Sequence, residues 1–355
     1  RHDRAAPAEP PGSGRYPLAW RQQRGVEQGR LHVRLGELQQ GFEVRNLPLT
    51  GDSIDEDVTT LMVVHPAGIP DSMQYAIDQF VLKGGKAIVY VDPYCESSRA
   101  SGNPMLDQGA PESASSLPRL FKAWGVDFTV DKVVGDAATA LQISVAADQP
   151  PVAHLGFLGL GVEQITREDV VTGSLESINL GMAGALKPAA GASTHFEPLL
   201  QSSAQSALLD AMQVQMNRDP AALLKGFAPT GERYTLAARI GGPAQSAFDG
   251  PQVEGREHVG AATDINVIVV ADADLLADRF WVQVQDFFGQ RTATAWADNA
   301  AFAQNALENL SGSSALIGIR SRGRYSRPFE LVQQIRLGAD ARYRESAELL
   351  QQRLD

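Results

Sequence analysis

The chain carries one cysteine, Cys95, and a histidine, His65, that each follow a run of apolar residues. Both are predicted at the carboxyl ends of parallel strands, the edge at which open α/β sheets build their sites. A thiolate beside an imidazole is the smallest nucleophile and base pair that could support a hydrolase. The surrounding sequence, DPYCESS, lacks the glycine-flanked elbow that exposes such a nucleophile. We therefore interpret Cys95 as a buried or loop thiol and expect no catalytic residue.

Carboxylates gather at two predicted strand ends. Asp272, Asp274 and Asp278 follow the apolar run 265–270, and Asp92 follows an earlier run. Alternate carboxylates after a strand can converge on a hard cation, but the turn glycine and distal glutamate of an EF-hand are missing. Helix capping is the simpler role, because an aspartate at a helix start accepts hydrogen bonds from free amides. We expect no metal site here.

Aromatic residues offer a third kind of chemistry. The segment 275–288 is predicted as a helix in which Phe280, Val284 and Phe287 share one face, so core packing is expected for them. Aromatic faces beside carboxylates also line sugar-binding clefts. The candidate ligand-binding residues are Asp92, Tyr94, Asp272, Asp274, Trp281 and Trp296. His154 and His195 are isolated, without metal-ligand spacing, and are interpreted as structural or surface residues.

Charge excludes several functions. The net charge of −11 argues against binding to nucleic acid, which needs a clustered basic surface. The concentrated basic group is Arg320, Arg322, Arg324 and Arg327. A solvated loop is its simple interpretation, and a contact with a partner subunit or lipid head groups is the alternative.

The chain lacks the G-x-x-x-x-G-K-[ST] motif of P-loop ATPases and a membrane-length apolar run.

The clearest structural unit in the sequence spans Thr59 to Pro93. Leu61 to Val64 is an apolar run, Asp71 can cap a helix, and Lys86 to Val91 is a second run rich in β-branched residues. Two such runs joined by one helix predict a right-handed parallel unit. The glycine fingerprint of dinucleotide sites is absent from the strand-to-helix turn, so no cofactor is expected.

The expected fold class is α/β: a Rossmann-like, amidotransferase-like parallel sheet flanked by helices, with an inserted α+β subdomain. The strands at 61–64, 87–91 and 265–270 are predicted to lie parallel in one sheet, with 136–260 mostly outside it. The expected regions are a disordered tail (1–30), the first half of the α/β domain (31–135), the insert (136–260), the second half (261–329) and the start of a C-terminal helical stalk (330–355).

Several segments carry a family resemblance. AIDQFVLKGGKAIVYVDP (76–93), INVIVVADADLLADRFWVQVQDFFG (265–289) and NALENLSGSSALIGIRSRGRYSRPF (305–329) resemble the periplasmic domain of GldG-like auxiliary subunits of uncharacterised ABC transport systems, particularly their proteobacterial branch. The family takes its name from gliding motility. The resemblance covers roughly residues 40 to 350.

This resemblance implies a location and partners. Family members typically carry transmembrane helices before and after the soluble domain, which implies a periplasmic domain of an inner-membrane protein, anchored through segments absent from this chain. The implied partners are ABC permease and ATPase subunits, and the implied role is non-catalytic. Two alternatives stay open: a module that binds an envelope glycan or peptide, and a hydrolase or amidotransferase-like enzyme using Cys95 and His65.

Overall fold

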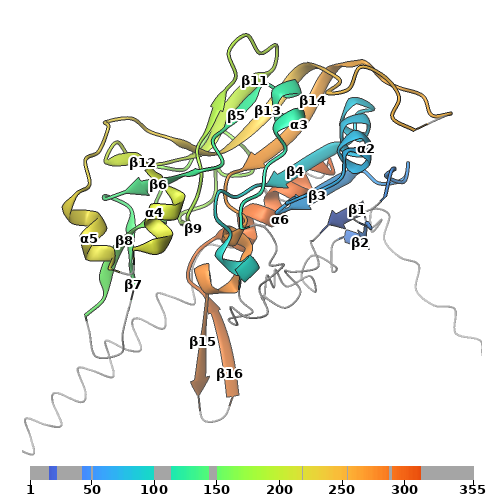
Figure 1. Ribbon diagram of the computed structural model, residues 1–355. Helices are drawn as coiled ribbons and strands as arrows, with labels where there is room; N and C mark the ends of the chain where they lie inside the picture. Colours follow the sequence, from blue (N-terminus) through green and yellow to red (C-terminus); the bar gives the residue numbers. More distant parts are fainter. Residues whose placement is uncertain are drawn as a thin grey trace, which may run out of the picture. The chain divides into compact units, whose positions relative to one another are not determined.

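The computed structural model describes residues 16–21, 42–48, 51–99, 113–143, 150–217, 219–253, 255–287 and 290–312. The basic cluster at 320–327 and the expected C-terminal helical stalk at 330–355 lie outside these ranges. The described part is a mixed α/β structure built around a nine-stranded sheet (Figure 1).

Five strands form the parallel half of this sheet, in the order β2-β1-β3-β4-β14. They are β1 (Tyr16–Arg21), β2 (Phe42–Asn46), β3 (Thr60–Val64), β4 (Lys86–Tyr90) and β14 (Ala261–Val270). The predicted parallel pairing of 61–64, 87–91 and 265–270 is confirmed. β1 lies within the stretch 1–30 and pairs with both β2 and β3.

The other half of the sheet is antiparallel. β13 (Thr235–Gln245) pairs antiparallel with β14, and β10 (Leu186–Pro188), β5 (Val126–Phe128) and β11 (His195–Gln201) continue from it. The region 136–260, which was predicted to lie mostly outside the sheet, thus contributes β10, β11 and β13 to it. The predicted parallel sheet is found only from β2 to β14, because β13 runs back along β14 over most of its length and starts an antiparallel extension.

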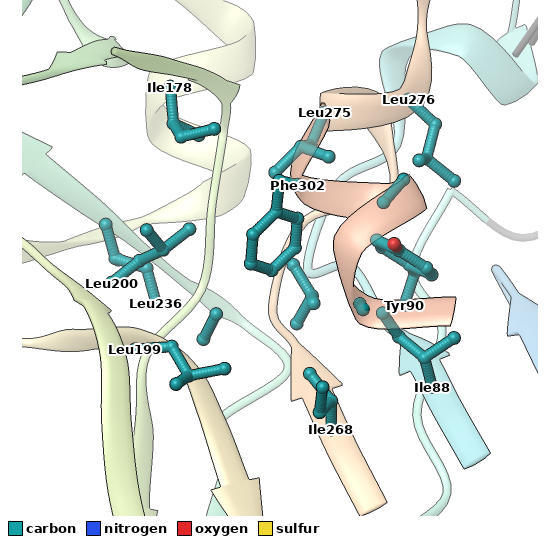
Figure 2. Close-up of a cluster of buried hydrophobic side chains, with 14 of the residues drawn as sticks. Ile88, Tyr90, Ile178, Leu199, Leu200, Leu236, Ile268, Leu275, Leu276 and Phe302 are labelled. Carbon is teal, nitrogen blue, oxygen red and sulfur yellow. The ribbon is translucent and has the colours of Figure 1, made fainter. Parts of the chain in front are cut away.

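Helices cover both faces of the parallel strands. α2 (Asp71–Leu82) and α3 (Pro118–Ala123) pack over one face, and α6 (Asn299–Leu310) packs over the other. Strand alternation explains the two cores: Met62, Ile88 and Ile268 belong to the α6 side, while their chain neighbours belong to the α2 side. In Figure 2, Phe302 of α6 lies among the buried aliphatic side chains. Truncating such a phenylalanine to alanine typically costs about 3–5 kcal/mol.

Three smaller sheets complete the described fold. The first pairs β6 (Lys132–Asp136) with β12 (Ser206–Asp210), beside the short helices α4 (Ala211–Met216) and α5 (Pro220–Lys225). The second contains β7 (Ala140–Ile143), β8 (Val152–Leu160) and β9 (Ile178–Gly181). The third is a hairpin of β15 (Val282–Phe287) and β16 (Gln290–Ala295).

The predicted helix at 275–288 is wrong. Two short 3-10 helices, η3 (Asp274–Leu276) and η4 (Asp278–Phe280), are followed by β15. The physical reason is visible in the sequence VQVQ (282–285), whose period of two fits a strand and not a helix. Phe280 and Phe287 consequently share no helical face.

α2 and α6 have 12 residues each. Within the described ranges no helix has both the length and the apolar character needed to cross a bilayer.

Candidate functional site

The parallel register brings three aspartates together at the carboxyl edge of the sheet. Tyr90 of β4 is paired with Val270 of β14, so Asp92 and Asp272 each stand two residues beyond paired positions. Asp274 follows at the start of η3. All three side chains are fully buried. The strand ends therefore place the predicted acidic residues in one cluster, which we call the carboxylate cluster (Asp92, Asp272 and Asp274).

Asp92 joins the segments that follow β4 and β14. Its Oδ1 accepts a hydrogen bond from the Tyr94 N–H at 2.7 Å, and its Oδ2 accepts one from the Ala273 N–H at 2.9 Å. Its own backbone N–H donates to Ser115 Oγ at 3.1 Å. The first bond folds a local turn and the second fixes the two strand ends to each other.

Asp272 connects β14 to the neighbouring three-stranded sheet. Its Oδ2 accepts a hydrogen bond from the Gly181 N–H at 2.6 Å, and its Oδ1 accepts one from the Leu275 N–H at 3.0 Å. The second bond satisfies a free amide in the first turn of η3. The predicted helix at 275–288, which an aspartate was expected to cap, is absent, and no side chain caps η3 at its N-cap residue, Ala273.

Asp274 holds the loop after β4. Its Oδ2 accepts from the Glu96 N–H at 2.7 Å and its Oδ1 accepts from the Ser97 N–H at 3.0 Å. Arg279 Nη2 lies 3.3 Å from Asp274 Oδ1 and 3.1 Å from Glu96 Oε2. One arginine thus pairs with a buried carboxylate and with a half-buried one.

Burial and mutual repulsion dominate the electrostatics of the cluster. Loss of hydration raises the pKa of Asp92 well above its ordinary value, and the nearby Asp272 and Asp274 raise it further. Loss of hydration, followed by the charge of Asp274, raises the pKa of Asp272 in the same direction. Backbone amides partly offset these effects by stabilising the anions. The cluster therefore favours the protonated form of Asp92 and Asp272.

Cys95 belongs to the same network. Its thiol lies 3.8 Å from Asp274 Oδ1, and the side chain is completely buried. Burial and the charges of Asp274 and Asp92 raise its pKa well above the ordinary thiol value. A nucleophilic cysteine needs the opposite shift, because the thiolate is the reactive form. The expectation of a buried thiol agrees with this geometry.

His65 directly follows β3 and has an unusual backbone conformation. Its φ is 47°, in the left-handed region, and its side chain is fully buried. Its backbone N–H donates to the Tyr90 carbonyl at 2.9 Å and its carbonyl accepts from the Ala67 N–H at 2.8 Å. The first bond joins this position to the end of β4, and the second closes the turn that follows β3.

The donor set of the cluster could suit a cation. One oxygen each from Asp92 and Asp274 and the sulfur of Cys95 lie within 4.8 Å of one another. However, each oxygen of these carboxylates already accepts a backbone amide. Loop anchoring therefore accounts for the buried carboxyl groups without requiring an ion.

The predicted aromatic candidates differ in exposure. Tyr94 and Trp281 are buried, at 8% and 6% exposure, whereas Trp296 is 47% exposed. The Trp296 N–H donates to the Trp281 carbonyl at 2.9 Å, so the two backbones lie side by side. His154 is buried and stacks on Phe157 with 4.3 Å between ring centroids.

A cavity that the sequence did not indicate lies at the opposite, amino-terminal edge of β4. It measures about 970 Å³ and is lined by the ends of α2 and α6 and by loops around Asp55 and Arg256. Lys83, Lys86 and Arg256 face it together with Asp55, Glu56 and Glu257. Because these residues come from distant loops without a shared motif, sequence patterns gave no signal for it.

Comparison with known families decides the assignment of the chain. A family model described as an ABC-type uncharacterized transport system matches residues 22–306. The chain belongs to this family. The match spans the parallel strands β3, β4 and β14, the carboxylate cluster and most of α6. This ABC-transport family assignment agrees with the resemblance at the level of an auxiliary component of an ABC transport system.

Other comparisons add little. No curated protein matches the sequence significantly. A ThuA-like protein from Bacteroides uniformis ATCC 8492 aligns with a TM-score of 0.40 and 11% identity, over 86% of this chain and 95% of that one. A cold-adapted β-galactosidase from Rahnella sp. R3 aligns with a TM-score of 0.32 and 10% identity, over 82% of this chain and 30% of that one.

Proposed function

We propose that this chain is the non-catalytic, extracytoplasmic domain of a membrane-anchored auxiliary subunit that works through contacts with the permease and ATPase of its ABC transport system. The finer assignment is to the GldG-like type, proteobacterial branch, of the gliding-motility-associated family. The domain is periplasmic, held at the inner membrane by segments beyond this chain.

The non-catalytic role rests on the burial and hydrogen bonding of the residues at the carboxyl edge of the main sheet. This edge is where an α/β sheet would place a nucleophile, a base or a ligand. Here Asp92, Asp272, Asp274 and Cys95 are fully buried, and the carboxylates accept hydrogen bonds from the backbone. The groups with reactive chemistry thus hold loops together.

The fold supports a related proposal. β3, α2 and β4 form a parallel crossover unit, to which β14 adds directly. We place this half of the sheet with Rossmann-like cores of the amidotransferase type, in which the antiparallel strands are additions. An experimental structure that paired β4 and β14 antiparallel would contradict this placement.

Two measurements test the proposal. Alkaline phosphatase is fused to the subunit directly after residue 355, and the enzyme should be active only if this domain lies outside the cytoplasm. An inactive but intact fusion protein would contradict the proposed location. A full-length gene that carries Cys95→Ser should complement a deletion strain as well as the wild-type gene does. Loss of function with an unchanged fold would contradict the non-catalytic role.

Binding of a peptide is a second candidate function, and the cavity at the amino-terminal edge is the observation that favours it. Its lining mixes cationic and anionic side chains, with Arg256 Nη2 3.6 Å from Asp52 Oδ1. A zwitterionic chain matches such a lining better than a neutral glycan does.

A tripeptide pool should raise the melting temperature of the wild type and not that of Lys86→Glu. Lys122→Glu, outside the cavity, is the control, and no shift for the wild type would contradict this function.

A further inference from the structure

The cavity at the amino-terminal edge of β4 runs along one face of α2. The helix contributes Tyr75, Ala76, Gln79, Phe80 and Lys83 to its lining, and the spacing of these positions places them on a single helical face. From Tyr75 to Lys83 the helix axis advances roughly 12 Å, at about 1.5 Å per residue. This face therefore gives the cavity a wall of defined length, with different residues at its two ends.

The loop before β14 is fixed at the Tyr75 end of the cavity. His258 Nδ1 lies 3.2 Å from Tyr75 Oη, and the two rings stack with 5.9 Å between their centroids. The Val259 N–H donates to Gln79 Oε1 at 2.7 Å, and Gln79 Nε2 donates to the Val259 carbonyl at 3.1 Å. Glu257 lines the cavity and directly precedes these two anchored residues. A carboxylate therefore stands at the Tyr75 end.

Two lysines stand at the other end, which we call the lysine end. Lys83 directly follows α2, and Lys86 is the first residue of β4. Both line the cavity, and the Lys86 N–H donates to the Thr59 carbonyl at 3.4 Å, which joins this end to the start of β3. Within the part of the chain that the structure describes, neither ammonium group has an ion-pair partner.

The other charged groups of the lining largely neutralise one another. Arg256 Nη2 lies 3.6 Å from Asp52 Oδ1, and Arg45 Nη1, from outside the lining, lies 3.9 Å from Asp55 Oδ2. Glu56 belongs to the turn that leads into β3, at the lysine end, where its charge offsets one of the two lysines. One positive charge remains in excess at the lysine end and one negative charge at the opposite end.

We propose that this cavity binds a peptide of three or four residues with both termini free, its carboxylate against Lys83 and Lys86 and its ammonium group against Glu257. This inference deepens the peptide-binding function proposed above and rests on it. An extended chain spans at most about 3.3–3.6 Å per residue, so three or four residues cover the distance between the two charged ends. The cavity volume of about 970 Å³ lies at the upper end of ordinary ligand sites, which measure about 300–1,000 Å³.

Length and charge separate this ligand from its alternatives. A free amino acid and a zwitterionic lipid head group also carry both charges, but only a few bonds apart, so neither reaches both ends of the cavity. An internal segment of a protein has no terminal charges to pair with the surplus groups. A polyanion would be attracted to the lysine end and repelled by Glu257.

The test compares chemically defined peptide pools by isothermal titration calorimetry with the intact subunit. A tripeptide pool with free termini should bind. Acetylation of its amino termini or amidation of its carboxyl termini should each weaken binding about tenfold, because each change removes a charged hydrogen-bonding partner. Dipeptide and hexapeptide pools should bind more weakly than tripeptide and tetrapeptide pools.

Variants assign each terminus to its end of the cavity. Glu257→Gln should bind the free and the acetylated tripeptide pools equally well and still discriminate against the amidated pool. Lys83→Gln combined with Lys86→Gln should show the reverse pattern. Lys122→Gln, on an exposed lysine of α3 outside the cavity, is the matched control and should discriminate as the wild type does.

The capped pools need no variant, so the inference stays testable if a substituted protein does not fold. If the wild type binds free and capped tripeptides equally, or binds hexapeptides best, the inference is overturned and peptide binding itself still stands. If no pool binds the wild type, the peptide-binding function fails, and this inference fails with it.

Discussion

Asp272 Oδ2 accepts a hydrogen bond from the Gly181 N–H at 2.6 Å, across 91 residues of sequence. This bond fixes the end of β14 to the end of β9, and so joins the main sheet to the three-stranded sheet. Gly181 is suited to this position because an added Cβ would collide with the ring of Phe280. The absence of a side chain lets the two segments approach closely enough for the carboxylate to reach the amide.

Gly181→Ala should therefore destabilise the protein. Forcing a methyl group against Phe280 in a packed core typically costs about 1–3 kcal/mol. The free energy of unfolding in urea measures the loss. Gly226→Ala is the matched control, because a Cβ there meets no atom within 4 Å. Equal stability of the two variants would show that the close contact at Gly181 is unimportant.

Removing Asp274 should loosen the loop after β4. Asp274→Ala leaves the amides of Glu96 and Ser97 buried without their acceptor, at about 1–3 kcal/mol for each unsatisfied group. Hydrogen exchange of these two amides should accelerate locally, beyond what the change in global stability explains. Asp71→Asn, at an exposed carboxylate, should leave their exchange unchanged. Unaltered protection in Asp274→Ala would contradict the anchoring role.

The carboxylate cluster should make stability depend on pH. The pKa of Asp92 and of Asp272 is raised in the folded protein, first by burial and then by neighbouring carboxylates. As pH rises above the unfolded value of about 3.9, the unfolded chain releases protons that the folded chain retains. The unfolded state is then favoured, so stability falls until pH passes the raised folded values.

Asp92→Asn should reduce this decline. The variant removes one carboxyl that the folded state holds protonated, so its urea midpoint should fall less than the wild-type midpoint between pH 4 and pH 8. The absolute stability of the variant is not the readout, because an asparagine NH₂ group cannot accept the second amide that Asp92 accepts. A wild-type profile that rises with pH over this window, or parallel profiles, would contradict the raised pKa.

The sequence was sufficient for the parts of the fold whose signals are local. The β3–α2–β4 unit and β14 were predicted because apolar periodicity and glycine stops mark them directly. β13 falls within the segment 136–260 that was predicted as an insert, and nothing local shows that it pairs with β14. That pairing depends on tertiary contacts, and it begins the antiparallel half of the sheet.

The candidate site was predicted only in part, because the positions of its residues have a local signal in the sequence and their burial does not. Asp92 and Asp272 follow strand ends, so a parallel register alone brings them together. Their burial was not predictable, because Gly181, Glu96 and Ser97 come from loops whose positions depend on the complete fold. The helix predicted at 275–288 failed where two 3-10 helices and a strand took its place. The spacing of the aromatic residues had suggested a helical period of 3.6. The alternating sequence VQVQ (282–285) instead forms part of strand β15.

Cys95 should react slowly with thiol reagents in the folded protein. Burial and adjacent carboxylates raise its pKa, so little thiolate forms at neutral pH. Labelling with a maleimide should become fast only in denaturant, and its midpoint should follow global unfolding. Rapid labelling of native protein at pH 7 would show that the thiol is accessible and would reopen the enzyme alternative with His65.

The basic cluster from Arg320 to Arg327, which lies outside the described residues, leads to a last prediction. It stands out on a chain of net charge −11, and the family assignment supplies an ABC transport system as the setting. Charges at the rim of an interface act mainly on association rate and salt sensitivity. Arg322→Glu combined with Arg324→Glu should therefore weaken co-purification with the permease more at low salt than at high salt. Lys122→Glu with Lys187→Glu is the control for a general change of charge. Equal recovery of both double variants at every ionic strength would exclude the arginines from the contact surface.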